Sequence, residues 1–228
     1  MKTNGNSIPI SLLFKPFTYC LFWVLASIWT FKINAETILV VDQFGQPIEN
    51  VVISFNENAT SEVDLADVAI MDQINRQFSP RVLVIQKNQA VAFPNSDDTR
   101  HHIYSFSKPK PFEIKMYKGG DSKQLTFNQS GIVVLGCNIH DQMVGYIYVA
   151  DNQHTLLTNA QGKAEIPTTG LAIQLWHSRL SADKITRKSI QLPTEFPEQP
   201  YRIVLNLLEE IKAPTTKTFR SKKSWKRK

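Results

Sequence analysis

The sequence predicts an all-β protein, an antiparallel sandwich or barrel with short β segments appended. Short runs rich in β-branched and aromatic residues recur along the chain, bounded by Gly, Pro, Asn or Asp. Many short strands at such spacing are typical of sandwiches and barrels. The expected strands are 37–41, 51–55, 82–85, 90–93, 102–106, 132–135, 144–149, 172–176 and 201–207. Residues 63–77 are only loosely periodic, so we expect a loop with a helical turn there.

The first 35 residues are predicted to be a signal peptide. Lys2 and Lys15 supply positive charge, a mostly apolar run follows at 17–31, and Ala35 is small enough for signal-peptidase cleavage. An uncleaved membrane anchor is the alternative, but the apolar run is short for a span of about 20 residues. We therefore expect cleavage after Ala35 and export to the periplasm.

Composition divides the remaining chain into three parts. Residues 36–150 are expected to form the main sandwich with its core at 78–149, and 151–211 a β-rich extension. Residues 212–228 hold eight Lys or Arg and no acid, which predicts a disordered basic tail. The tail is either a solvated terminus or a contact for an anionic membrane or partner. Nucleic-acid binding is not expected, because basic and aromatic residues do not alternate in the folded part.

Cysteine usage points to a ligand. Cys20 lies in the signal segment, so the mature chain retains Cys137 alone and cannot form an internal disulfide. A single cysteine in an exported protein is a free thiol, an intermolecular link or a metal ligand.

Cys137 begins a dense run of metal donors, in which Cys137, His140 and Met143 follow the spacing Cys-x2-His-x2-Met. Thiolate, imidazole and thioether together suit copper, and two histidines, one cysteine and an axial methionine form the blue-copper pattern. Zinc also accepts Cys and His, but Met143 and the lack of a second cysteine argue against it. Hydrolytic use of the Cys137–His140 pair lacks an identifiable substrate pocket.

A second histidine must come from elsewhere, and His101 and His102 are the candidates. They follow a loop that begins at Asn95 and joins two expected strands. Loops distant in sequence can converge on one metal when both lie at the same end of a sandwich. Either histidine remains possible from the ligand chemistry alone.

Over about 78–149 the sequence resembles the cupredoxins, in particular the plastocyanin and amicyanin group. The matching motifs are Phe-Ser-Pro at 78–80, Val-Ala-Phe-Pro-Asn-Ser-Asp at 91–97, Phe-Asn-Gln-Ser-Gly at 127–131, the Cys-x2-His-x2-Met loop and Gly-Tyr-Ile-Tyr-Val at 145–149. The resemblance implies a Greek-key cupredoxin sandwich. It also implies His101 as the first ligand, six residues after Asn95, with His102 in place of the family's usual asparagine. The whole chain is similar to exported bacterial proteins labelled methylamine utilization proteins.

The resemblance further implies a non-enzymatic carrier of single electrons with one type 1 copper ion. His101, Cys137, His140 and Met143 would hold the metal, with Asn95, His102 and Asn138 around them. The expected partner is a redox protein, such as a cytochrome or a dehydrogenase. Copper delivery or storage is a rival function, although the chain is poor in methionine, and a non-catalytic binding module is another.

Overall fold

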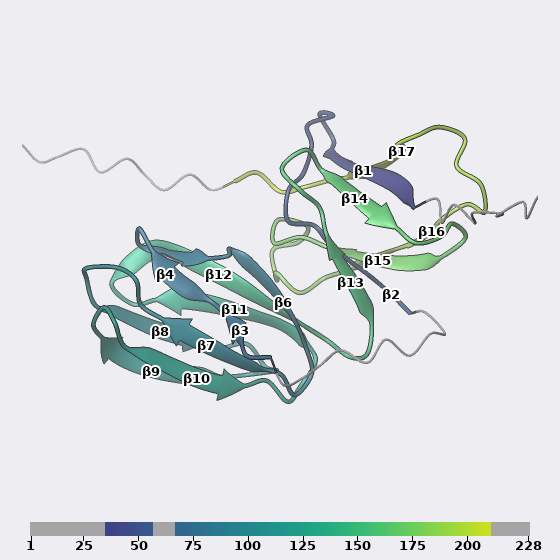
Figure 1. The fold of residues 1–228 in the computed structure, drawn as a ribbon. Coiled ribbons are helices and arrows are strands. Elements are labelled where there is room, and N and C mark those ends of the chain that lie inside the picture. Colours follow the sequence, from purple (N-terminus) through teal and green to yellow (C-terminus); the bar gives the residue numbers. More distant parts are fainter. Residues whose placement is uncertain (1–34, 57–66, 211–228) are drawn as a thin grey trace, which may run out of the picture. The chain divides into compact units, whose positions relative to one another are not determined.

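The computed structural model describes residues 35–56 and 67–210, which form strands joined by turns and loops (Figure 1). The all-β prediction is confirmed. No helix occurs in the described ranges, and therefore none that could cross a membrane. The expected signal peptide and basic tail lie outside the described residues, except for Ala35.

The first sandwich comprises strands β3 to β12, and two of its sheets enclose one apolar core. The smaller sheet has the order β10-β7-β3, and the larger has the order β6-β12-β11-β8-β9. Two further strands, β4 and β5, form a hairpin. The strands are β3 Ala69–Ile70, β4 Asp72–Ile74, β5 Gln77–Ser79, β6 Val82–Gln86, β7 Ala90–Pro94, β8 His101–Ser105, β9 Phe112–Tyr117, β10 Ser122–Thr126, β11 Gly131–Cys137 and β12 His140–Ala150.

Strand alternation sorts the side chains of β11 and β12 between two cores. Successive residues of a strand point to opposite faces of its sheet. On β11, Val133, Leu135 and Cys137 share the core of the first sandwich, and on β12 Met143 and Ile147 do the same. The even-numbered residues Ile132, Tyr146, Tyr148 and Ala150 belong to a different buried cluster. The same alternation that buries the apolar residues therefore carries Cys137 and Met143 to the inner face.

The second sandwich combines the start of the described chain with its end. One sheet has the order β14-β1-β17, in which β1 pairs with β17 in parallel, and the other has the order β13-β2-β15-β16. Its strands are β1 Glu36–Asp42, β2 Val52–Phe55, β13 His154–Leu157, β14 Lys163–Ile166, β15 Ala172–Trp176, β16 Lys188–Gln191 and β17 Tyr201–Leu205. Its core is mostly aliphatic and includes Ile38, Ile53, Leu175 and Leu205.

A third buried cluster contains residues of both sandwiches. Trp176 of β15 is fully buried and makes ring contacts with Tyr146 and Tyr148 of β12. Ser54 of β2 and the Tyr148 hydroxyl form a buried hydrogen bond of 2.9 Å. The cluster also includes Val52, Val82, Ile132 and Ala150.

Two expectations differ from this arrangement. Residues 36–55 were expected within the main sandwich, but their strands pair only with strands of the second sandwich. The expected helical turn in 63–77 is wrong for the described residues 67–77. There, β3 adds to the edge of β7, and β4 turns back into β5. Pairing with a neighbouring strand satisfies the backbone of this segment without a helix.

Candidate metal centre

The ligand loop is a tight connection between β11 and β12. Cys137 is the last residue of β11, His140 is the first of β12, and only Asn138 and Ile139 lie between them. The two strands pair up to Gly136↔Val144, and a register shift then sets Cys137 opposite His140. Long, buried strands hold both ends of the loop, so the cysteine and the histidine are fixed by the sheet rather than by a flexible linker.

His101 reaches the same place from the neighbouring strand. β8 pairs with β11, with Ile103 opposite Cys137. His101 is two residues before Ile103 and therefore lies on the same face of β8. Its Nδ1 is 3.8 Å from Cys137 Sγ, and His140 Nδ1 is 3.7 Å from the same sulfur. The two imidazole rings are 5.0 Å apart between centroids.

The three donor atoms fit a single metal ion. One atom each from His101, Cys137 and His140 lie within 4.8 Å of one another. Ligands at about 2.0 Å for nitrogen and 2.3 Å for sulfur lie at most about 4.3 Å apart on one ion. The two nitrogen–sulfur separations satisfy this limit. Two imidazoles and one thiol are also the equatorial set expected for type 1 copper.

Asp97 orients the imidazole of His101. The ring donates from Nε2 to Asp97 Oδ2 at 2.7 Å, because an ionised carboxylate can only accept. This bond leaves the Nδ1 lone pair facing Cys137, which is the usual role of a carboxylate behind a metal-binding histidine. His101 is fully buried, so its ring has little freedom to turn away.

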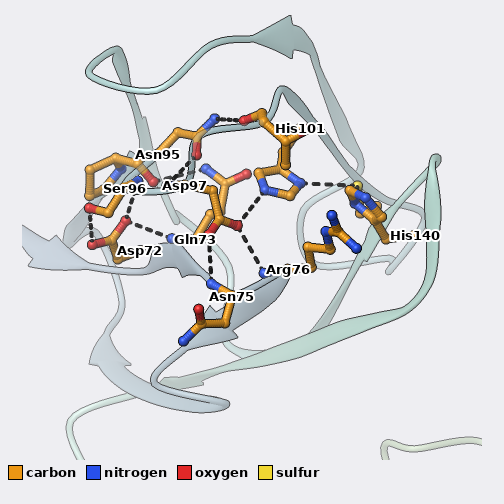
Figure 2. Close-up of polar contacts among 12 residues, drawn as sticks. Asp72, Gln73, Asn75, Arg76, Asn95, Ser96, Asp97, His101 and His140 are labelled. Atoms are coloured by element: carbon orange, nitrogen blue, oxygen red, sulfur yellow. Dashed lines mark hydrogen bonds and ion pairs between the residues drawn. The ribbon is translucent and has the colours of Figure 1, made fainter.

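Asp97 is itself held by the β4–β5 hairpin (Figure 2). Its Oδ1 accepts the Asn75 backbone N–H at 2.6 Å, and its Oδ2 accepts that of Arg76 at 2.9 Å. Burial raises the pKa of the Asp97 carboxyl. The hydrogen bonds from these two amides and from His101 outweigh burial, so the pKa lies below its ordinary value. The carboxylate is therefore ionised at neutral pH.

Further polar contacts fasten the loop that carries Asp97. Asn95 donates to the carbonyls of Thr99 at 2.9 Å and Tyr117 at 3.2 Å, and its Oδ1 accepts the Asp97 N–H at 3.0 Å. The Tyr117 hydroxyl donates to the Phe93 carbonyl at 2.8 Å and contacts the buried amide of Gln73. Burial raises the pKa of Tyr117 to about 12, so this hydroxyl stays protonated.

His102 points away from the three donors. Its Nε2 bonds to Glu113 Oε1 at 2.9 Å, and its ring lies 6.0 Å from that of Tyr104, which is on the same face of β8. His101 and Ile103 take the opposite, buried face. Of the two candidate histidines, only His101 lies beside Cys137 and His140.

The remaining candidate residues differ in exposure. Met143 is buried on the core face of β12, whereas Asn138 is exposed in the ligand loop. His140 is half-buried, and Ile139 beside it is 46% exposed. Partial burial, and then the nearby His101 and Arg76, lower the pKa of His140. Its imidazole is therefore neutral at pH 7, with a lone pair available for a metal.

The sequence reasoning did not assign roles to Asp97 or to the β4–β5 hairpin. Asp97 had a signal, because it lies four residues before His101 in a loop already suspected of supplying a ligand. The hairpin had little sequence signal, because each of its strands is only three residues long.

Comparisons with known proteins found similar chains among the solved structures. No protein-family model matches the chain, and no curated protein matches it. Among solved structures, a purple cupredoxin from Nitrosopumilus maritimus is 23% identical, with 36% of this chain and 99% of that chain covered and a TM-score of 0.33. A reduced mutant of amicyanin is 19% identical over 45% of this chain and 100% of its own, with a TM-score of 0.35.

A copper-containing nitrite reductase from Thermus scotoductus is also similar. It is 23% identical, with 49% of this chain covered and a TM-score of 0.36, and the match spans only 28% of the reductase. At these identities and scores, the likenesses assign no residue role and no activity.

Proposed function

We propose that this protein is an exported type 1 copper protein that passes single electrons between redox partners. The convergence of His101, Cys137 and His140 on one point is the observation that carries the proposal. The buried Met143 on β12 would be the fourth residue to hold the metal. Copper bound to these donors would cycle between Cu(II) and Cu(I), which is one-electron chemistry without a substrate.

The protein contributes rigidity to this chemistry. Cys137 and His140 are fixed by paired strands, and His101 by burial and by Asp97. Donors that are already in place need to move little when the charge of the metal changes. Small rearrangement between the two oxidation states favours fast electron transfer.

His140 is the proposed point of electron entry and exit. Of the three donor residues, His101 and Cys137 are buried, and His140 alone reaches the surface. The exposed Ile139 next to it supplies an apolar contact for a partner protein. We propose that the partner, a cytochrome or a dehydrogenase, docks over His140 in the periplasm.

Copper titration of the mature protein tests this function. Adding Cu(II) to the metal-free protein should produce an intense blue thiolate-to-copper absorption band and a reversible one-electron couple. Cys137→Ser should abolish the band. His101→Ala should weaken or shift it strongly, whereas His102→Ala should leave it in place, because His102 is directed to Glu113.

Other outcomes point to other functions. A protein that takes up copper without a blue band, and yields Cu(I) readily to a chelator, is a carrier or a store rather than an electron-transfer protein. Tight binding of zinc with no response to copper would contradict the proposal altogether.

A further inference from the structure

The tip of the β4–β5 hairpin places an unusual residue beside the candidate metal centre. Asn75 and Arg76 form the two-residue turn, with φ of 54° and 59°. A turn with both central residues at positive φ favours Asn followed by Gly, because bulky side chains are strained in the left-handed region. Arginine therefore occupies a position where glycine would be less strained, and such strained positions are concentrated at functional sites.

The backbone of Arg76 belongs to the support of His101. Its N–H donates to Asp97 Oδ2, the same oxygen that accepts His101 Nε2. Any residue except proline could make this contact, so it does not explain an arginine.

The Arg76 side chain extends towards His140. In Figure 2 the Arg76 side chain leaves the hairpin tip away from Asp97 and points towards His140. The guanidinium carries a full positive charge at neutral pH. No carboxylate among the described residues forms an ion pair with the guanidinium. The nearby Asp97 carboxylate bonds to the Arg76 backbone N–H and to His101, so the guanidinium has no ion-pair partner of its own.

We propose that Arg76 is a positioning residue that raises the reduction potential of the copper centre, through its unpaired charge beside His140. This inference rests on the proposed function. Reduction of Cu(II) to Cu(I) lowers the charge of the centre by one. A fixed positive charge nearby favours the lower charge, and hence the reduced form. Arg76 is exposed, so salt should weaken the effect.

Arg76→Gly separates the charge from the backbone contact. Glycine accepts a φ of 59° without strain and keeps the N–H that bonds to Asp97. We expect the blue band to keep its wavelength and the metal-free protein to be at least as stable to heat. At a fixed applied potential, the Cu(I)/Cu(II) ratio should fall about threefold to tenfold at low salt, where tenfold corresponds to 59 mV for one electron.

Two variants make the result specific. Arg76→Lys keeps the positive charge and should retain most of the wild-type potential. Lys163→Gln removes an exposed charge from β14 of the second sandwich and should leave the potential unchanged. The measurement is redox titration of the copper-loaded protein followed through its blue band, at low and at high salt.

The possible outcomes separate a failure of the Arg76 role from a failure of the proposed electron-transfer function. If the wild-type protein shows a reversible couple and Arg76→Gly has the same potential, the role of Arg76 is refuted and the function stands. If the reduction potential of Arg76→Lys falls as far as that of Arg76→Gly, charge is not the cause, and the role is again refuted. A wild-type protein with no reversible copper couple overturns both.

Discussion

The two sandwiches use their buried polar residues differently. The first buries Gln73, Asn95, His101 and Ser105, three of which lie within or beside the hydrogen-bonded network behind the candidate metal centre. The second buries Ser54, Thr158 and Ser178. Thr158 bonds to the backbone of Val51 and Ile48, which closes a turn. Buried polar groups must find partners. In the first sandwich, the hydrogen bonds that meet this requirement also hold His101 in place.

The histidines of the second sandwich lie in other surroundings. His154 stacks on Phe55 at 5.7 Å between ring centroids, and His177 Nδ1 accepts the Arg179 backbone N–H at 3.2 Å. Within the described parts of the chain, the only group of three Cys, His or acidic donors close enough for one metal is His101, Cys137 and His140. In this protein, histidines form a candidate metal site where strand ends of the first sandwich bring them together with a cysteine.

The largest expected effect comes from breaking the cluster that the sandwiches share. Trp176→Ala should cost about 3–5 kcal/mol of unfolding free energy, because it removes a fully buried indole. It should also split thermal unfolding into two transitions, since Trp176 contacts Tyr146 and Tyr148 of the first sandwich. Calorimetry measures both effects.

Leu175→Ala is the matched control for this prediction. Its side chain lies in the second sandwich's own core, so a loss of about 2–5 kcal/mol without a separate transition is expected. Identical melting profiles for the two variants would show that the shared cluster does not couple the sandwiches.

The next effect is an acid sensitivity of the second sandwich. Burial lowers the pKa of His177 to about 4, assisted by the charges of Arg179, Arg81 and Lys184. In the unfolded chain the pKa of His177 is near 6.5. Between pH 6.5 and 4, His177 is therefore protonated in the unfolded chain but neutral in the folded chain. The His177 contribution is complete above pH 6.5. It is lost on acidification by at most about 1.4 kcal/mol per pH unit.

His177→Gln should remove that part of the slope. Urea unfolding of both proteins at several pH values between 4 and 7 measures the difference. Parallel curves for wild type and variant would rule out a buried neutral His177.

Asp97→Asn tests the polar network of the first sandwich. The carboxylate bonds to His101 and to the Asn75 and Arg76 backbones, and hydrogen bonds to charged groups contribute about 1.5–3 kcal/mol. We expect a loss in this range for the metal-free protein at pH 7. Because the pKa of Asp97 is lowered in the folded protein, the loss should begin to shrink near the ordinary carboxyl pKa of about 3.9, where the unfolded chain takes up a proton first. It should vanish only at lower pH, once the native carboxylate is protonated as well. An unchanged midpoint in urea at pH 7 would contradict the prediction.

The smallest effect concerns one hydrogen bond between the sandwiches. Ser54→Ala removes the partner of the Tyr148 hydroxyl and should cost about 0.5–1.5 kcal/mol. Ser54→Ala, Tyr148→Phe and the double variant form a cycle that isolates the coupling. Additive losses would mean that this bond contributes nothing to stability.

The sequence was most informative where chemistry and strand pattern coincide within a short stretch. Cys137, His140 and Met143 lie within seven residues and between two apolar strands, so their proximity follows from chain connectivity. The sequence also supplied both histidine candidates, because few residue types can complete a copper site. It could not choose between them by ligand chemistry, since adjacent residues of a strand offer the same donor on opposite faces.

What the sequence by itself determined is the β class and the identity of the donor-rich loop, because alternation and ligand spacing are local properties. The tertiary structure decided the rest. It turned His101 inward and His102 to Glu113, placed Asp97 and Arg76 behind and beside the donors, and joined 36–55 to the end of the chain. Each of these depends on pairing between segments far apart in sequence, and such pairings are set by the packing of the whole core.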